Sequence, residues 1–374
     1  MSCTTNCVSL KWFGDLSKTI TESLCSFYCE FNHIVNTSFK DDGVYLSLFC
    51  ITVNIFHITV LLQKSMRASP IFILMAAVAM MDVVMLTYAV VKAFATFFQI
   101  LYLCYSKETD YAVMTILMVT EYARNFARRC STWFSLSISI VRTLVIRYPM
   151  STRMENLSRP KAAFGIVGGI MAVIIPVNIL DVFRLSVNVA HEPYICSEYG
   201  MGNQFRAYDV TRSQYFKTHY ELVQTTYKII DGITSKMIPC ILFPIATVFL
   251  ILEIQKSNIL RKKMTSQPTS NNSSNTSYLV LVQTLAFFIA ELPLGTIFLL
   301  QSLFDDTAYY GVYELLISFE IFFTTFVPAT TSSHMVICMF MSSQYRMNAL
   351  MIIRCGYPIK EKKEENNLVA TRIA

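Results

Sequence analysis

The stretch PIFILMAAVAMMDVVMLTYAVV, Pro70 to Val91, decides the fold class of this chain of 374 residues. It carries one charged residue, Asp82, and is otherwise almost wholly apolar. A helix needs roughly 20 mainly apolar residues to cross a bilayer, where only helices and closed barrels satisfy every backbone group. The stretch therefore predicts a transmembrane helix.

Six more stretches meet the same test to differing degrees. Four of them are about as clear: Gly43–Leu62, Ala162–Phe183, Tyr278–Leu303 and Leu315–Met341. The fifth helix in chain order, around Met237–Leu252, is short but extends back through Ile233. The third, about Ala112–Ile146, is the least apolar because it carries charged residues: Glu121, Arg124, Arg128 and Arg129. We predict an all-α membrane protein, a bundle of seven transmembrane helices.

The composition indicates the same class. Hydrophobic residues make up 54% of the chain and charged residues 15%, whereas a globular domain has about 45–50% and about 25%. The net charge of +6 comes mostly from short basic clusters between the apolar stretches, so no nucleic-acid partner is expected. The first residues, MSCTTNCVSLKWFGD, lack the pattern of a secretory leader, so we expect the first helix to direct insertion.

The distribution of basic residues between the connections predicts the orientation, because short cytoplasmic loops are rich in Lys and Arg. One set of connections holds most of the bases, among them Lys64, Arg67, Arg153, Arg159, Lys161, Lys256, Arg261, Lys262, Lys263, Arg354 and Lys360. The other set balances its bases with acids: Asp41, Asp42, Glu108, Asp110, Glu192, Glu198, Asp209, Asp305, Asp306 and Glu314. The first set is expected inside the cell. This places the amino terminus outside, in a multi-pass protein of the plasma membrane.

The chain divides into four expected segments. Residues 1–42 form an extracellular amino-terminal segment, and residues 43–341 form the seven-helix domain. Residues 342–356 form an amphipathic helix on the membrane surface. Residues 357–374 are charged, lack an apolar period and form a disordered cytosolic tail. Cys355, at the end of the surface helix, is a palmitoylation candidate and so a contact with membrane lipid.

The expected topology also sorts the glycosylation acceptors and the cysteines. Asn36, in the triplet Asn36-Thr37-Ser38, is expected outside and is the credible glycosylation site. Six cysteines are expected outside, where disulfides form: Cys3, Cys7, Cys25, Cys29, Cys104 and Cys196. We favour a Cys104–Cys196 bridge, because it ties the connection before the third helix to the long loop after the fourth. The alternative is that amino-terminal cysteines pair with these loops.

Two motifs resemble those of rhodopsin-like G-protein-coupled receptors. SIVRTLVIRYPM places Arg142 seven residues before Pro149, the spacing of the Asp/Glu-Arg-Tyr motif and its trailing proline, with Val141 in the position of the acid. TTSSHMVICMFMSSQYR is similar to the NSxxNPxxY motif and the following S-x-x-F-R. Here His334 replaces the asparagine and Cys338 replaces the tyrosine.

More specific strings narrow the resemblance: KSMRASPIFILMAAVAMMD (64–82), RRCSTW (128–133), VRTLVIRYPMS (141–151), FFIAELPLG (287–295) and SSHMVICMFMSSQYR (332–346). They resemble the nematode serpentine receptors of class W, chemoreceptor-like proteins related to FMRFamide-type neuropeptide receptors. The resemblance covers about residues 40 to 355. It implies a ligand-gated switch of rhodopsin-like fold, coupled to a heterotrimeric G protein. No cofactor or metal is expected.

Charged residues inside the predicted spans are the candidates for the ligand site, because ionisable groups in a bilayer are costly and normally face the bundle interior. Glu121, Arg124 and Arg128 have i, i+3, i+7 spacing and so share one helix face. With Glu291 and Glu320 of the sixth and seventh helices, they are expected to line an outward-facing cavity. Its ligand, a peptide or a small molecule, carries an anionic or hydrogen-bond-accepting group, because guanidinium forks suit carboxylates.

The same charges admit a second interpretation. An Arg128–Glu291 or an Arg129–Asp82 ion pair would only neutralise buried charge. Both interpretations hold together if a ligand competes for one of the arginines.

A second polar group is expected deeper in the bundle. Asp82, Ser131 and His334 match a cluster that binds sodium in many receptors of the larger family, and Asn54 belongs to the same expected network. Because histidine replaces asparagine here, a hydrogen-bonded network that responds to protonation is the alternative to a sodium site.

The resemblance assigns G-protein coupling to Arg142 and Pro149 after the third helix, and to Tyr345 and Arg346 after the seventh. Arg142 is the residue expected to contact the G protein. Its usual neighbouring acid is missing, because Val141 stands there. The resting state is therefore expected to rely on another restraint.

A membrane transporter or channel is the alternative function, because buried Arg, Glu, Asp and His also mark substrate paths. No internal duplication is evident in the sequence, and an odd number of helices fits a receptor better. An intramembrane enzyme is not expected, since the sequence lacks the G-x-S-x-G and H-E-x-x-H signatures.

Overall fold

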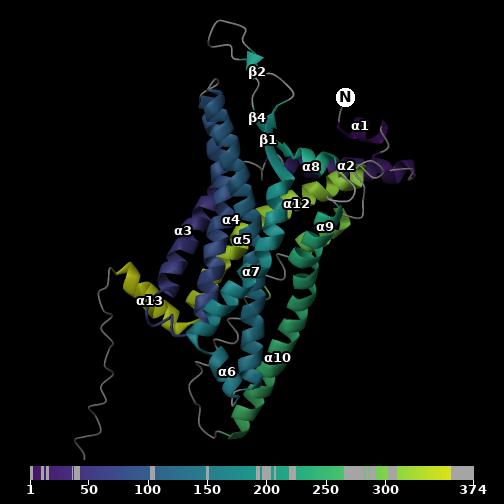
Figure 1. Ribbon diagram of the computed structural model, residues 1–374. Coiled ribbons are helices and arrows are strands. Elements are labelled where there is room, and N and C mark those ends of the chain that lie inside the picture. Colours follow the sequence, from purple (N-terminus) through teal and green to yellow (C-terminus); the bar gives the residue numbers. More distant parts are fainter. Residues whose placement is uncertain are drawn as a thin grey trace, which may run out of the picture.

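The computed structural model of the chain describes residues 3–9, 12–13, 17–35, 37, 43–101, 106–148, 151–190, 194–195, 204–205, 208–218, 225–264, 282, 285, 292–301 and 310–354. Within these residues the chain forms a bundle of long helices (Figure 1). The first four are α3 (Gly43–Leu61), α4 (Pro70–Leu101), α5 (Lys107–Arg147) and α7 (Pro160–Arg184). The fifth consists of α9 (Thr225–Asp231), the π-helical turn η3 (Gly232–Met237) and α10 (Ile238–Met264). The apolar helix Leu292–Gln301 and α12 (Tyr310–Met341) follow, so each predicted span contains a helix.

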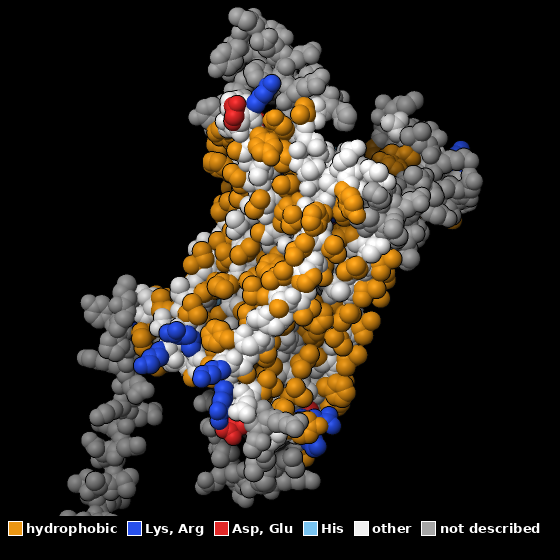
Figure 2. Space-filling view, viewed as in Figure 1, with side chains coloured by type: hydrophobic (Ala, Val, Ile, Leu, Met, Phe, Trp, Pro, Cys, Tyr) orange, Lys and Arg blue, Asp and Glu red, His pale blue; other side chains and the backbone are white. Residues whose placement is uncertain are grey.

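Three helices of the described part are long and apolar enough to cross a membrane: Gly43–Leu61, Pro70–Phe98 and Pro160–Arg184. A fourth span is added if Ser332–Phe340 and Ser343–Ile353, which meet at 109°, are counted as one. Helix α5 is not among them, although it is 41 residues long, because charged residues lie along its middle. Figure 2 shows hydrophobic side chains along the flank of the bundle and charged side chains toward its ends. This distribution suits a bundle whose flank lies in lipid.

The core of the bundle is built around the first turns of α4. Leu74 and Val78 of α4 are fully buried and pack in one cluster with Phe134 and Ile138 of α5. Helices α3, α5 and α7 all contact α4. Most side chains of α7, such as the 73% exposed Val173, face away from the bundle, where lipid covers a membrane protein.

Helix α4 and the fifth helix extend furthest beyond the ranges that hydropathy predicted. Helix α4 continues past Val91 to Leu101, and the fifth helix begins at Thr225 instead of Ile233. The added turns of the fifth helix contain Tyr227 and Asp231, whose side chains pair with Arg129 inside the bundle. Polar groups satisfied by one another extend this helix beyond its apolar limit, which a hydropathy window cannot detect.

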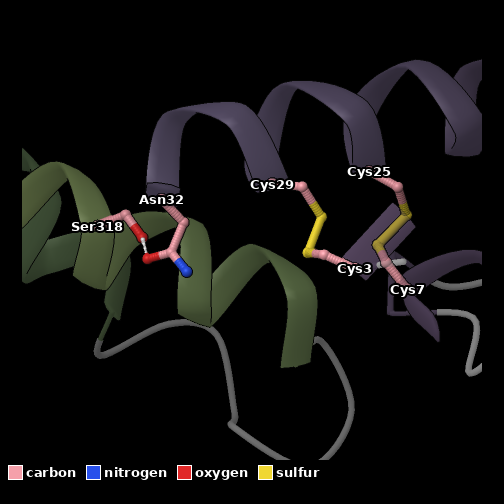
Figure 3. The surroundings of a disulfide bond; sticks show 6 residues. All are labelled: Cys3, Cys7, Cys25, Cys29, Asn32 and Ser318. Carbon is pink, nitrogen blue, oxygen red and sulfur yellow. Dashed lines mark hydrogen bonds between the residues drawn. A yellow bond between two sulfur atoms is a disulfide. The ribbon is translucent and has the colours of Figure 1, made fainter. Parts of the chain in front are cut away.

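The amino-terminal segment folds into two helices that the sequence analysis did not predict. Helices α1 (Cys3–Ser9) and α2 (Lys18–Ile34) are joined by two disulfides, Cys3–Cys29 and Cys7–Cys25 (Figure 3). The Cα atoms of the two pairs lie 6.0 and 5.8 Å apart. The four cysteines bind one another, so the alternative that they pair with later loops is wrong.

Several predicted features lie outside the described residues and stay predictions. They are the Cys104–Cys196 bridge, the glycosylation of Asn36 and the palmitoylation of Cys355.

A β-hairpin follows α7 in the long connection to the fifth helix. Strands β1 (Leu185–Val189) and β4 (Tyr208–Arg212) are antiparallel, with Leu185 opposite Arg212. The short strands β2 (Tyr194–Ile195) and β3 (Gln204–Phe205) pair beyond them. Helix α8 (Gln214–Thr218) leads from the hairpin back toward the bundle. This hairpin lies in the long loop after the fourth predicted helix.

At the other end of the bundle, α6 (Thr152–Leu157) connects α5 to α7, and α13 (Ser343–Ile353) follows α12. Helix α13 lies within the predicted surface helix. The Ser342 hydroxyl caps it by accepting the Tyr345 N–H at 3.2 Å.

Candidate functional site

Helix α5 begins with a capped first turn that fixes the hairpin to the bundle. The Ser106 hydroxyl oxygen accepts the Thr109 N–H at 3.2 Å. The backbone N–H at Glu108, and then the Ser106 hydroxyl, hold the pKa of the exposed Glu108 carboxyl below its usual value. Asp110 accepts the Tyr208 N–H of β4 at 2.5 Å, so the hairpin is tied to this end of α5.

The charged face of α5 lines a cavity in the half of the bundle near this hairpin. The cavity has a volume of about 290 Å³. It is lined by Glu121, Arg124, Asn125, Arg128, Arg129, Thr132, Arg184, Arg212, Phe216, Tyr227, Asp231, Ser235, Phe298, Gln301, Tyr313 and Glu320. The walls come from α5, α7, the fifth helix, Leu292–Gln301 and α12, and β4 and α8 add one residue each.

Arg129 joins three helices at the base of this cavity. Its Nε donates to Asp231 of α9 at 2.9 Å, and its Nη2 donates to Asp181 of α7 at 2.9 Å. The remaining bonds run from Nη1 to Asn178 at 3.0 Å and from Nη2 to the Tyr227 hydroxyl at 3.2 Å. Arg129 is 6% exposed and Asp181 is fully buried. The guanidinium fork therefore holds α5, α7 and α9 at one fixed spacing.

Asp181 also binds a second arginine. Its Oδ1 lies 3.1 Å from Arg184 Nε, and the other end of Arg184 pairs with Glu121 at 3.4 Å. The Tyr227 hydroxyl donates to the same carboxylate at 2.5 Å. These contacts satisfy the buried carboxylate from several sides, as a charge inside a bundle requires.

Two further contacts shape the cavity wall. Arg124 lies over the Tyr88 ring, with its guanidinium carbon 4.3 Å from the ring centroid, in a cation–π arrangement. Gln301 donates to Glu320 at 2.9 Å and so joins the helix Leu292–Gln301 to α12.

The described lining is electropositive. Five arginines and three carboxylates line the cavity, and the buried Asp181 pairs with two of those arginines. A cavity of this kind attracts anions, because charges interact more strongly away from bulk water. The arginine forks suit the paired oxygens of a carboxylate or a similar anionic group.

The structure brings together most of the ligand residues predicted from sequence. Glu121, Arg124, Arg128 and Glu320 line the one cavity. Glu291 lies outside the described residues. The expected Arg129–Asp82 ion pair is wrong, because Arg129 is paired with acids of α7 and α9 instead.

Sequence reasoning missed the carboxylates that hold Arg129. Asp181 lies in the last turn of α7, and Asp231 lies before the apolar part of the fifth helix. Charges at the ends of apolar stretches are usually assigned to loops. Arg129 itself could have indicated these partners in the sequence, because a buried cation in the middle of a helix needs acids at the same depth on neighbouring helices.

The predicted internal polar network is buried in the structure. Asn54, Asp82, Ser131 and His334 are 1%, 1%, 6% and 4% exposed. Ser131 donates to Asp82 at 2.8 Å, and Asn54 donates to the Cys50 carbonyl oxygen at 3.0 Å. Among the described residues, His334 makes no hydrogen bond to the other three.

Tyr345, which the resemblance assigns to G-protein coupling, lies in the core. Its side chain is fully buried, and its hydroxyl lies 2.7 Å from Nδ1 of His57 in α3. The ring packs in the same core cluster as Leu61 and Cys338. Tyr345 therefore faces neither the membrane surface nor a soluble partner in this conformation, and it fastens α13 to α3.

The other predicted coupling residues lie at the same end of the bundle. Arg142 is partly buried in α5 and has no acidic partner within the described part of the chain. Arg346 donates to the carbonyl oxygens of Met339 and Phe340 at 3.2 and 2.8 Å and so caps α12. Pro149 lies outside the described residues.

One ion pair that the sequence did not predict joins two helices at this end. Arg147, the last residue of α5, lies 3.6 Å from Glu253 of α10.

A helix bundle with an apolar flank, a charged interior and a cavity near one end is the architecture of a polytopic membrane protein. Residues 41–356 of the chain match the family described as serpentine type 7TM GPCR chemoreceptor Srw. The chain belongs to this family, and its fold is the seven-transmembrane bundle of a G-protein-coupled receptor. It is therefore an integral membrane protein of a receptor family, which is not a family of enzymes. No curated protein matches the chain.

Proposed function

We propose that this chain is a chemosensory receptor that binds an anionic ligand among the cavity arginines and passes the signal to a heterotrimeric G protein. The observation that carries the proposal is the clustering of five arginines around one cavity of a chemoreceptor-family bundle.

The proposed orientation places the cavity end outside the cell. The hairpin, α1 and α2 lie toward the same end of the bundle, opposite α13 (Figure 1). The two disulfides of α1 and α2 suit an oxidising compartment. The basic connections after α3 and α5 and beyond α13 suit the cytoplasmic side.

The size of the cavity limits the part of the ligand that enters it. A volume of about 290 Å³ is at the lower end of ligand pockets, which run from about 300 to 1,000 Å³. The buried part is therefore a small acid or one acidic group of a peptide. The remainder of a peptide would lie against β4 and α8, from which Arg212 and Phe216 reach the cavity.

The proposed signal runs along α5. Its outer half carries the cavity arginines, and its inner end carries Arg142 and Arg147. A ligand that draws Arg124 or Arg128 inward shifts the helix whose other end meets the G protein. Such a ligand favours the active conformation only to the extent that it binds that conformation more tightly.

Arg124 provides the sharpest test, because its guanidinium group lies over an aromatic ring and pairs with no acid among the described residues. A panel of small organic acids and acidic peptides is applied to cells that express the full chain and a promiscuous G protein. Arg124→Ala is expected to reduce the response to an active compound at least tenfold, while surface delivery stays unchanged. The matched control, Arg159→Ala, removes an exposed arginine far from the cavity and leaves the response intact. An unaltered dose response of Arg124→Ala contradicts the cavity assignment.

A further inference from the structure

Helix α2 presents three different faces. One face packs against neighbouring elements and contains Cys25, Tyr28 and Asn32. A second face is polar and exposed, with Lys18, Glu22, Glu30 and His33. Between them runs a seam of exposed apolar residues at i, i+7 and i+14: Ile20, Phe27 and Ile34 are 52%, 49% and 50% exposed.

The packed face holds α2 on the outer end of α12. Asn32 accepts a hydrogen bond from Ser318 at 3.2 Å, on the side of α2 from which Cys25 and Cys29 also project (Figure 3). The Phe31 ring lies 4.7 Å from the ring of Phe319. Through its disulfides to α1, the helix gains a second anchor at Trp12, whose carbonyl oxygen accepts the Gly311 N–H at 2.8 Å.

Gly311 makes this second anchor possible. A Cβ atom at that position would lie 2.7 Å from the Trp12 carbonyl oxygen, so any side chain there would push the two backbones apart. The Trp12 ring also meets Tyr310 edge to face at 4.9 Å. Hydrogen bonds, ring contacts and disulfides together fix the direction in which the apolar seam points.

The seam continues the apolar flank of the bundle. Phe27 stacks on Phe31 at 5.8 Å and lies 6.4 Å from Phe319 of α12. Ile321, two residues further along α12, is 38% exposed. Helix α12 in turn packs on α3, whose Phe49 is 64% exposed. The seam therefore meets α12 where Phe27 lies beside Phe319, and exposed apolar side chains also occur on α12 and α3.

We propose that α2 is a membrane-interface helix whose Ile20–Phe27–Ile34 seam is immersed in the lipid surface beside α12. A helix with one packed, one apolar and one charged face fits the boundary between headgroups and acyl chains, where the apolar side is buried and the charged side is hydrated. The partner is lipid and not a second copy of the chain, because Phe27 of the seam lies beside Phe319 of α12, which the sequence predicts to span the membrane.

Quenching of a fluorescent residue tests this placement in the full-length protein. A fluorescent noncanonical amino acid replaces Phe27, and the matched control carries it at Glu30, on the polar face of the same helix. The proteins are reconstituted in phosphatidylcholine nanodiscs. Nitroxide-labelled phosphatidylcholine is expected to quench position 27 several-fold more than position 30, and iodide in the buffer is expected to show the reverse order.

Two results would overturn the proposal. Iodide quenching of position 27 equal to that of position 30 means that the seam faces water. Shielding of position 27 from both quenchers, together with dimers in the nanodisc, means that a second copy covers it.

A second measurement uses the unsubstituted protein and does not depend on the labelled variants folding. Nanodiscs that contain phosphatidylcholine with a photoreactive acyl chain are illuminated, and the adducts are located by mass spectrometry. Adducts on the peptide that contains Phe27 support the immersion of α2. Adducts on α3 and α7 with none on α2 overturn it.

Discussion

Arg129 is the residue on which the outer half of the bundle depends. Its three nitrogens bind two carboxylates, an amide and a phenol on two other helices, and it is almost fully buried. Lysine cannot replace it, because one ammonium group lacks the planar fork that reaches both Asp181 and Asp231. Loss of the side chain leaves those two carboxylates close together without their shared cation.

Arg129→Ala is therefore expected to destabilise the protein severely. Removing one partner of a buried ion pair costs about 3–5 kcal/mol, so the variant should show a large fall in the midpoint of thermal unfolding in detergent. Arg159→Ala is the matched control, because its pair with Glu155 is exposed and such pairs contribute about 0–1 kcal/mol. Equal melting of Arg129→Ala and the wild type would show that the cation is not structural.

At the scale of elements, the sequence predicted the order of the helices from the apolar stretches along the chain. It predicted the charged face of α5 from the spacing of charged residues within that one helix. The i, i+3, i+7 pattern of Glu121, Arg124 and Arg128 needs no tertiary information. The partners of Arg129 were not predictable in this way, because Asp181 and Asp231 approach it only when three helices pack. Burial of Tyr345 depends likewise on His57, far away in the chain.

Helices α1 and α2 were missed for a different reason. Their apolar residues are too few for a transmembrane span, and the helices are held by disulfides and by docking on α12. Hydropathy identifies helices that lipid stabilises, and it does not identify short helices stabilised by cross-links.

The Arg147–Glu253 ion pair joins α5 to α10. It can restrain the resting state of this chain, in which Val141 takes the place of the usual acid beside Arg142. Arg147 is 46% exposed, so the pair contributes only about 0.5 kcal/mol. Because RT is about 0.6 kcal/mol, losing about 0.5 kcal/mol shifts the equilibrium between two conformations about twofold. If α5 and α10 separate on activation, Glu253→Gln should therefore raise ligand-free signalling about twofold.

Second-messenger output normalised to surface receptor measures this effect. Glu155→Gln is the control, because its pair with Arg159 lies within one short stretch and does not join two bundle helices. A basal output of Glu253→Gln that matches or falls below that of the control rules out the restraint.

At the scale of the whole molecule, the two ends of the bundle are built for different surroundings. One end carries disulfides, a hairpin and an arginine-rich cavity, and the other carries α13, the buried Tyr345 and the basic connections. An odd number of spans is needed to place the two chain termini on opposite sides of one membrane.

Epitope tags at the two termini test this arrangement. Antibody is expected to bind an amino-terminal tag on intact cells and a carboxyl-terminal tag only after permeabilisation. An internal control is the same tag placed after Ser158, in the basic connection between α5 and α7, which should also need permeabilisation. Access to both terminal tags from the same side would mean an even number of spans, and the proposed orientation would fail.

The π-helical turn Gly232–Met237 governs how this chain tolerates a change in length. A π turn contains an additional residue, so the side chains before it are rotated by roughly 100° relative to those after it. That offset lets Tyr227 and Asp231 face Arg129 while Phe243 and Leu250 stay in the core. A one-residue deletion here would convert the turn to ordinary helix and swing the outer segment away from Arg129. Length variation among related chains is therefore expected to spare this turn and to accumulate in the connections between helices.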